Sequence, residues 1–83
     1  MSLVSKDKEK RIKEDVLRVL YENSPKKLYT YFIAEELARD DEFMLRLLNE
    51  LHQEGLINKF QKGRKNLWGL PDSVFNKYKE ILS

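Results

Sequence analysis

The sequence predicts an α+β fold in one small domain, with three helices, a β-hairpin and a last helix in that order. Two neighbouring segments, 30–39 and 41–54, carry apolar residues at helical spacing and are separated by a short polar break. A basic turn between two strand-like runs follows within residues 56–70. The length of 83 residues suits a single hydrophobic core, because two domains of half this size would bury too little apolar area.

The composition indicates a folded and mainly helical chain. Hydrophobic residues make up 41% of the sequence and charged residues 36%, whereas disordered chains are poorer in apolar and aromatic residues. We therefore expect residues 6–83 to form one domain. Residues 1–5 do not fit the helical pattern that follows them, so we expect a disordered N-terminus or an expression scar there.

The first helix is predicted from about Lys6 to Tyr21. It ends before Pro25, because proline pushes the residue before it out of the helical region. Residues 28 and 29 are expected to form a short strand. The inward positions of the first helix recur at helical spacing and are Ile12, Val16, Val19 and Leu20.

The second and third helices are predicted from their caps as well as from their spacing. Thr30 is the expected N-cap of the second helix, which runs to about Arg39, and Asp40 is the expected N-cap of the third. Gly55 is expected to end the third helix in a left-handed conformation. The inward residues are Ile33 and Leu37 in the second helix, and Met44, Leu47, Leu48 and Leu51 in the third.

The hairpin is predicted as two strands, 56–61 and 66–70, joined by a turn at residues 62–65. Gly63 can adopt the positive φ that such a turn requires. Trp68 and Leu70 are expected to anchor the hairpin to the core.

A last helix is predicted to open at Pro71 and Asp72, with an apolar stripe along one face. The complete order of elements is that of a winged helix-turn-helix, with a three-helix core, a two- to three-stranded β wing and a C-terminal helix. The stripe of the last helix comprises Val74, Tyr78, Ile81 and Leu82.

Part of the chain resembles a known family of DNA-binding proteins. Between Ile33 and Ile57 the pattern I-A-x-x-L, six residues, Met44, three residues and then L-x-x-L-x-x-x-G-L-I is similar to the helix-turn-helix core of winged-helix regulators of the MarR and ArsR classes. Residues 45–52 also resemble the winged helix of the archaeal factor TFE and of the large subunit of factor IIE. The sequence departs from the regulator pattern at Ala38 and Arg39, where a glycine is usual in the turn.

The resemblance implies binding to double-stranded DNA as a transcriptional regulator, with a dimer supplying two half-sites. The recognition helix would be Asp41–Glu54. Its expected base-facing residues are Arg46, Asn49 and Gln53, whose side chains can pair with guanine or adenine edges in the major groove. An alternative is that Glu42 and Glu50, each four residues from Arg46, occupy its guanidinium in ordinary helix-surface ion pairs.

The wing, Lys59–Lys65, is predicted to contact phosphates, because a protruding cationic loop reaches the backbone whether or not a helix reads bases. A solubilising turn is the alternative. Thr30 and Tyr31 are candidates for a second phosphate contact at the start of the second helix, or form a simple cap. The cations of the wing are Lys59, Lys62, Arg64 and Lys65.

The distribution of charge leaves a second function open. Residues 57–70 contain four basic and no acidic residues, whereas residues 31–56 contain seven acidic and two basic residues. The acidic helix pair would suit a basic protein partner, and the chain would then be an interaction module in a transcription or other multi-subunit assembly. The interface would include Phe43 and Leu45, which together with Tyr31 or Phe32 would form an exposed apolar patch. The alternative is that Phe43 and Leu45 are buried under the first or the last helix. Tyr78 would either close the core against the first helix or contact a second subunit.

Catalysis is not expected. The sequence has no cysteine, and its one histidine, His52, does not lie in a metal-binding or nucleophile-activating pattern. No glycine-rich phosphate loop is present, so we expect neither a cofactor nor a metal. The first residues lack the apolar run of a secretory signal, and nothing approaches the roughly 18 consecutive apolar residues that a membrane span needs. A cytoplasmic location is therefore expected.

Overall fold

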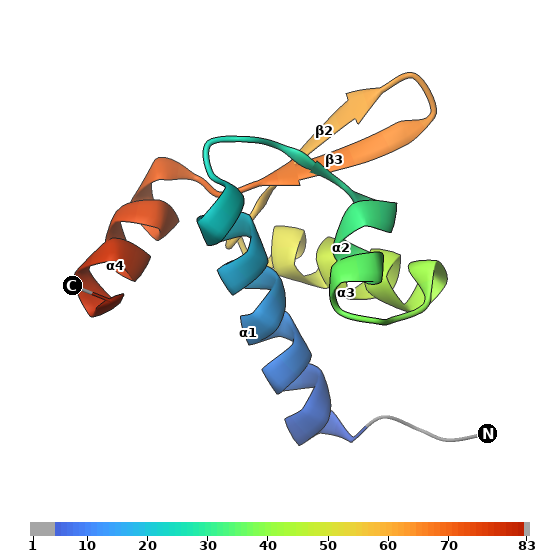
Figure 1. Cartoon of the computed structure of the whole chain (residues 1–83), viewed down its shortest axis with the longest axis horizontal. Helices are drawn as coiled ribbons and strands as arrows, with labels where there is room; N and C mark the ends of the chain where they lie inside the picture. The colour runs from blue at the N-terminus through green and yellow to red at the C-terminus, as the bar shows by residue number, and fades with distance from the viewer. Residues whose placement is uncertain (1–4, 83) are drawn as a thin grey trace.

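The computed structural model describes residues 5–82, and Figure 1 shows their arrangement. Four helices and three strands follow one another in the predicted order. The elements are α1 (Lys6–Asn23), β1 (Leu28–Tyr29), α2 (Thr30–Glu36), α3 (Asp41–Gln53), β2 (Asn58–Lys62), β3 (Lys65–Gly69) and α4 (Asp72–Leu82).

The N-cap of helix α1 is Ser5, one residue before the predicted start of the domain at Lys6. The side chain of Ser5 caps the helix by accepting from the backbone N–H of Lys8 at 3.2 Å. Residues 1–4, the rest of the predicted N-terminal extension, lie outside the described residues. At its other end α1 runs two residues past the predicted limit, and the Asn23 side chain donates to the Val19 carbonyl oxygen at 2.8 Å.

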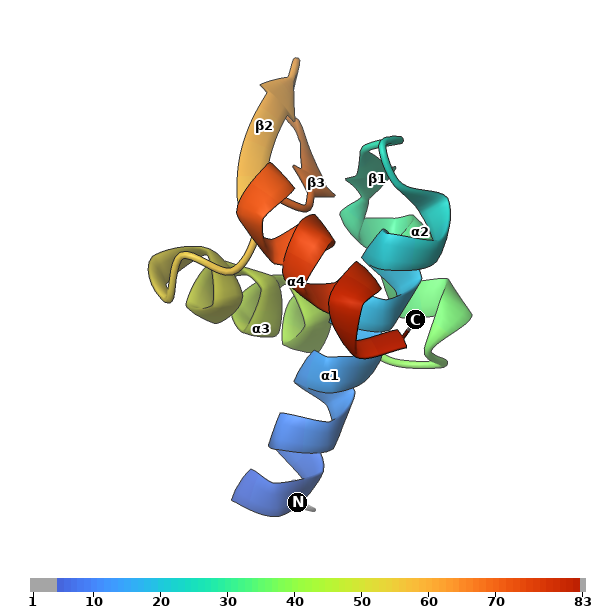
Figure 2. The same ribbon diagram turned by 90° about the vertical axis from the view of Figure 1, so that its left-hand side faces the viewer.

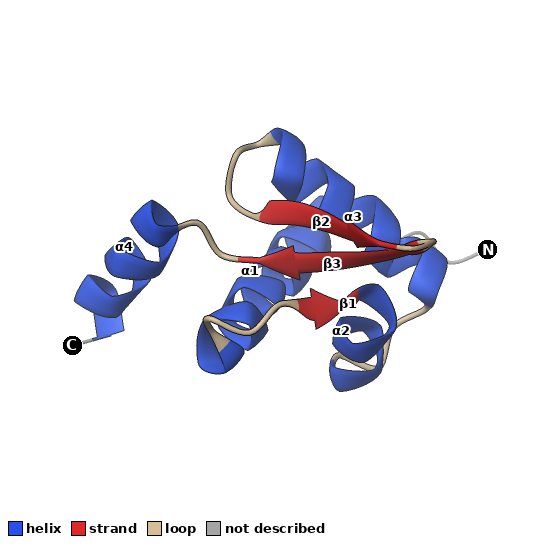
Figure 3. Ribbon diagram, turned by 90° about the horizontal axis from the view of Figure 1, so that it is seen from above, coloured by secondary structure: helices blue, strands red, loops and turns tan. Residues whose placement is uncertain are grey.

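The three strands form one antiparallel sheet in the order β1-β3-β2. Figure 3 shows β3 in the middle of the sheet, with α1 and α3 behind it. Trp68 pairs with Leu28 on one side and with Lys59 on the other. This register places the indole of Trp68 in the core, where it is fully buried.

The core contains the predicted inward residues of the first three helices and the predicted tryptophan anchor. Leu37 and Leu70 lie at its edge and are half-buried. The fully enclosed set draws on three helices, on β1 and β3, and on Ile57 just before β2, so α1, the helix pair and the sheet share one apolar interior. Its members are Ile12, Val16, Val19, Leu20, Leu28, Ile33, Ala34, Met44, Leu47, Leu48, Leu51, Ile57 and Trp68.

The connection from α2 to α3 differs from the prediction. Helix α2 ends at Glu36 and not near Arg39. The Ala38 N–H donates to the Glu35 carbonyl at 3.1 Å and the Arg39 N–H to the Ala34 carbonyl at 2.8 Å, with Ala38 at a φ of +53°. These two bonds form a Schellman motif, the usual glycine-ended helix terminus, with alanine in the glycine position. The sequence pattern continued to Arg39 because alanine and arginine are both good helix formers.

The prediction that Thr30 caps α2 was also wrong. Tyr29 is the N-cap residue and provides no side-chain hydrogen bond, while Thr30 is the first residue of the helix. The Thr30 hydroxyl oxygen instead accepts from the indole N–H of Trp68 at 2.8 Å. Asp40, by contrast, caps α3 as predicted, because its carboxylate accepts from the N–H groups of Glu42 and Phe43.

The hairpin is shorter and tighter than predicted. β2 begins at Asn58, because Leu56 is used in the Schellman motif that ends α3, where its N–H donates to the Leu51 carbonyl. Only Gly63 and Arg64 form the turn, since Lys62 and Lys65 already pair across the strands. Gly63 has a φ of +62°, which matches the first central position of a two-residue type II′ turn.

Helix α4 lies against the C-terminal part of α1, as Figure 2 shows. Phe75 and Tyr78 place their rings 5.0 and 5.1 Å from the ring of Tyr21. No residue of α4 is buried, and Ile81 and Leu82 are 73% and 61% exposed. The apolar stripe of α4 therefore only partly covers α1. Within residues 5–82, no helix combines the length and the apolar character that crossing a membrane requires.

Candidate nucleic-acid interface

The outward face of α3 is fixed by the burial of its opposite face, where four side chains enter the core. Asn49 lies beside the hairpin and accepts a hydrogen bond from the Lys59 ammonium at 3.0 Å. Gln53 is exposed near the C-terminal end of the helix. Two of the three predicted base-facing residues therefore lie on the outward or hairpin side of α3.

Arg46, the third of these residues, is turned toward α1. Its guanidinium lies 3.2 Å from the Glu9 carboxylate and 2.8 Å from that of Glu50, which raises its pKa. The predicted pair with Glu50 is present. Glu42, the other predicted partner, forms no ion pair within the described part of the chain, and Glu9 of α1 takes its place.

An ion-pair network continues along the edge between α1 and α3. The Lys13 ammonium lies 3.0 Å from Glu50 and 3.2 Å from Glu54. Hydrogen bonds from Lys13, and then from Arg46, lower the pKa of the Glu50 carboxyl against the opposing effect of partial burial. For Lys13 partial burial acts to lower the pKa, but its bonds to the two glutamates outweigh this and raise it. The network holds α3 to α1 on the side away from the hairpin.

The hairpin projects beyond the helices (Figure 1). It carries the predicted cations. Lys62 and Arg64 are exposed at its tip. Lys65 lies over the stacked rings of Tyr29 and Tyr31, with its ammonium 5.6 and 5.5 Å from the two ring centroids. Lys59, at the base, lies 5.5 Å from the Trp68 ring centroid. The tip cations are therefore exposed, and the other two lie over aromatic rings.

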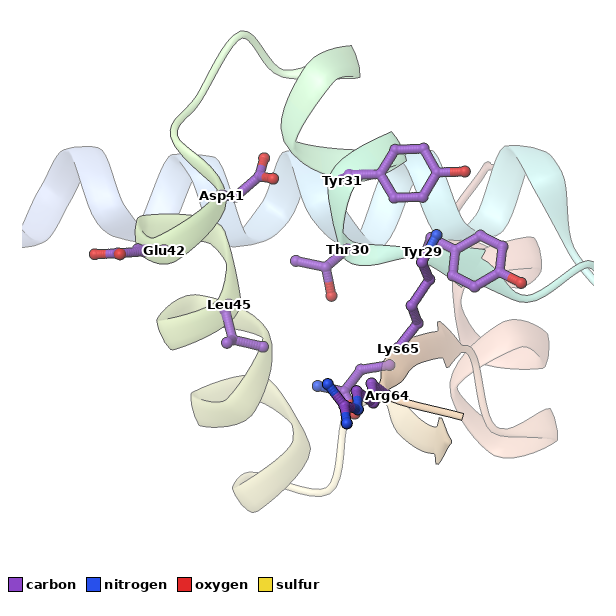
Figure 4. A pocket seen from close by; sticks show the side chains of 9 residues that line it. Tyr29, Thr30, Tyr31, Asp41, Glu42, Leu45, Arg64 and Lys65 are labelled. Carbon is purple, nitrogen blue, oxygen red and sulfur yellow. The ribbon is translucent and has the colours of Figure 1, made fainter. Parts of the chain in front are cut away.

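A hollow of about 270 Å³ lies between the N-terminal half of α3, the start of α2 and the tip of the hairpin (Figure 4). We call it the α3 hollow. Leu45, Tyr29 and Tyr31 contribute apolar surface to its lining. Asp41 and Glu42 lie on the α3 side, and Arg64 and Lys65 lie on the hairpin side. Its lining residues are Tyr29, Thr30, Tyr31, Asp41, Glu42, Leu45, Arg64, Lys65 and Asn66.

Of the two alternatives for Phe43 and Leu45, an exposed apolar patch or burial, the structure is nearer to burial. Phe43 and Leu45 are half-buried and pack against the core, because both lie beside the buried stripe of α3. Tyr31 and Phe32, at 49% and 38% exposure, are the more accessible apolar residues of this region. Tyr78 packs on Tyr21 and is half-buried.

Two residues of this surface were missed in the sequence. Tyr29 stacks on Tyr31 at a centroid distance of 5.4 Å. Strand alternation could have indicated it, because the inward position of Leu28 turns the next side chain outward. Glu9 could not have been found by spacing, since it is 37 residues from Arg46 and meets it only when α1 and α3 pack together.

Solved structures with the same arrangement are known. A mutant of MepR from a multidrug-resistant clinical isolate of Staphylococcus aureus is 25% identical and superimposes with a TM-score of 0.74, over 88% of this chain and 55% of that chain. The fold is a winged helix-turn-helix. The MepR–DNA complex matches at 23% identity and a TM-score of 0.73, over 86% of this chain and 62% of that one. ZitR of Lactococcus lactis matches at 23% identity and a TM-score of 0.73, over 92% of this chain and 58% of that chain.

This winged helix thus spans a little over half the length of the solved chains that it matches. MepR is described as a transcription regulator of the S. aureus multidrug efflux pump MepA. No protein-family model and no curated protein matches the sequence. The β-hairpin is the wing of the fold, and α2 and α3 are its helix-turn-helix pair.

Proposed function

We propose that this chain is a DNA-binding transcriptional regulator whose single domain, residues 6–83, binds double-stranded DNA. The observation that carries the proposal is the position of the wing cations and the outward face of α3 on two sides of the same hollow. A duplex bound by the wing cations would therefore lie against the outward face of α3. The structural match to MepR, which has been solved in complex with DNA, supports the same interpretation.

In this proposal α3 and its C-cap residue Glu54 form the recognition helix, Asp41–Glu54, which enters the major groove. The wing Lys59–Lys65 follows the backbone. Lys62 and Arg64 are free to neutralise phosphates, and Lys59 and Lys65 lie close enough to join them. Such contacts position the protein without selecting a sequence.

Asn49, Gln53 and Arg46 face the bases in the proposed complex. Asn49 and Gln53 suit adenine, which offers an acceptor and a donor side by side in the major groove. Arg46 would have to exchange its bonds to Glu9 and Glu50 for a guanine edge. We therefore expect Arg46 to contribute less than an unpaired arginine would.

Thr30 and Tyr31 are proposed as backbone contacts at the start of α2. The Thr30 oxygen accepts from Trp68, which leaves its O–H free to donate to a phosphate oxygen. Tyr31 is half exposed, and its hydroxyl is a second donor.

The test is fluorescence anisotropy with a labelled random-sequence duplex at several salt concentrations. We expect salt-sensitive binding, and a Lys62→Ala, Arg64→Ala, Lys65→Ala variant should lose up to about three units of the slope of log K against log salt. The matched control is Lys6→Ala, Lys8→Ala, Lys10→Ala, which removes the same charge from the exposed start of α1, far from the wing (Figure 1). Absence of binding at low salt, or equal slopes for the two triple variants, would contradict the proposal.

The alternative proposal is a protein-interaction module in a multi-subunit assembly that does not contact bases. The exposure of Tyr31 and Phe32 on an acidic helix pair favours it. A basic partner held there should be released by Phe32→Asp or Leu45→Asp and should respond less to salt than a duplex does.

The remaining features of the proposal follow from its mechanism. The chain acts by binding alone, without catalysis, cofactor or metal, and we propose that it does so in the cytoplasm. It would bind two half-sites as a homodimer, with the apolar stripe of α4 as the contact between subunits. In this stripe Tyr78 is half-buried, and Ile81 and Leu82 are exposed.

A further inference from the structure

We propose that Leu45 and Glu42 select pyrimidines in the major groove, Leu45 by contact with a thymine methyl group and Glu42 by accepting from the amino group of a neighbouring cytosine. The inference rests on the proposed function, because it assumes that α3 and the wing hold one duplex.

The first argument is which α3 side chains are available. Arg46 is held by two carboxylates, and Asn49 accepts from Lys59. Leu45 and Glu42 are three residues apart and therefore lie on one face of the helix. Both line the α3 hollow. Figure 4 shows the Leu45 side chain on the hairpin side of α3, whereas the exposed Glu42 carboxylate points away from the hairpin. A duplex that contacts the wing and α3 together must pass over this hollow.

The second argument is the chemistry of the hollow at Leu45. Leu45, Tyr29 and Tyr31 are among its lining residues. Figure 4 shows Leu45 on the α3 side and the two tyrosine rings on the other side, beyond the Lys65 side chain. The C5-methyl of thymine is the apolar group that a base pair presents in the major groove. Since the other base edges present polar groups there, a thymine methyl is the part of a duplex that matches this apolar surface.

The third argument concerns Glu42. Its side chain is exposed, and within residues 5–82 its carboxylate has neither an ion pair nor a hydrogen bond. An ionised carboxylate only accepts hydrogen bonds. Cytosine presents a lone amino donor in the major groove, whereas guanine presents two acceptors and adenine places an acceptor beside its donor. Glu42 therefore favours cytosine over either purine.

The first experiment selects binding sites from a random-sequence duplex library with the wild-type chain. We expect enrichment of a thymine next to or near a cytosine. Glu42→Gln should change the selected cytosine to adenine, because an amide can both accept from N6 and donate to N7. Asp41→Asn removes the same charge from the adjacent residue and should keep cytosine, which separates a charge effect from base selection.

The second experiment replaces the selected thymine by deoxyuracil, which removes only the methyl group. The wild-type chain should lose about fourfold in affinity, the worth of one buried methyl group. Leu45→Ala should bind the two duplexes equally, whereas Leu37→Ala, which alters a half-buried leucine outside the hollow, should keep the difference. The ratio of two affinities for one protein does not depend on its folded fraction.

The outcomes distinguish this inference from the proposed function. Salt-sensitive binding without pyrimidine enrichment, or the same thymine-to-uracil ratio in wild type and Leu45→Ala, overturns the inference and leaves the regulator proposal in place. If the chain binds no duplex at low salt, both are overturned.

Discussion

Ala38 shows how one residue ends the first helix of the helix-turn-helix. The Schellman motif that ends α2 requires a left-handed residue, and Ala38 adopts it at a φ of +53°. The motif at the end of α3 is the same, but there Gly55 takes the position at +79°. A side chain in the left-handed region costs roughly 1–2 kcal/mol. The same motif is therefore strained at the end of α2, where alanine adopts the left-handed conformation, and unstrained at the end of α3, where glycine does.

Ala38→Gly is therefore expected to stabilise the fold. Relief of the left-handed strain exceeds the entropy that glycine adds to the unfolded chain, and a net gain of about 0.5–1 kcal/mol in the free energy of unfolding should result. Gly55→Ala is the matched control and should lose about 1 kcal/mol, since no atom lies within 4 Å of the added Cβ and only the backbone resists it. Urea unfolding measures both, and a loss of stability in Ala38→Gly would contradict the account.

Thr30 is expected to contribute to stability through Trp68. Thr30→Val keeps the shape of the side chain but leaves the buried indole N–H without an acceptor, which costs about 1–3 kcal/mol. Thr30→Ser retains the hydroxyl and should lose much less. Chemical unfolding followed by Trp68 fluorescence compares the two variants. Equal losses of stability in Thr30→Val and Thr30→Ser would show that the hydrogen bond contributes little.

The predicted threonine and aspartate caps show what sequence can predict at this scale. Asp40 caps α3 because its short carboxylate reaches the first free N–H groups, and this interaction is local. Thr30 has the same local signal, but Trp68, 38 residues away, takes its hydroxyl. A local rule fails where a distant side chain competes for the same atom.

At the scale of elements, the ion-pair network of Glu9, Lys13, Arg46, Glu50 and Glu54 joins α1 to the recognition helix. Glu50 has a pKa below its ordinary 4.5, so the folded state binds its proton more weakly than the unfolded state does. Its stabilising effect is therefore complete above pH 4.5 and is lost as the pH falls through the lowered pKa.

Glu50→Gln should destabilise the fold at pH 7 by less than about 1 kcal/mol, because the pairs are partly exposed and screened by solvent. The difference from wild type should shrink as the pH falls below 4.5. Glu14→Gln, a charge change on the exposed face of α1, is the control and should have little effect at either pH. Urea midpoints at neutral and acidic pH measure this, and a difference that stays constant with pH would show that Glu50 acts without its charge.

The helices of the core were predictable because each carries its own periodic signal. Met44, Leu48 and Leu51 face inward as the 3.6-residue spacing requires. The hairpin was predicted in place but not in detail, because strand ends depend on the Schellman motif before β2 and on the pairing of Lys62 with Lys65. The site followed the same pattern: the wing cations were evident in the sequence, whereas the α3 hollow exists only where α2, α3 and the wing meet.

At the scale of the whole molecule, α4 is the element whose environment the sequence could not define. Its apolar stripe was compatible with closing the core or with meeting a second subunit. The structure leaves the end of that stripe exposed, since the rings of Phe75 and Tyr78 reach Tyr21 while Ile81 and Leu82 do not become buried. Two neighbouring large aliphatic side chains in water are an unfavourable arrangement that a second copy would relieve.

We therefore expect the chain to associate, with an apparent mass that rises with concentration and a melting temperature that rises with it, because association stabilises the folded state by mass action. Ile81→Lys should abolish both effects. Asn76→Lys adds the same charge on the opposite, exposed face of α4 and should leave them unchanged. Sedimentation equilibrium and thermal unfolding at several concentrations measure the two quantities. A wild-type chain that remains monomeric and melts at one temperature throughout would remove α4 as a dimer contact, and two half-sites would then have to be bound by independent monomers.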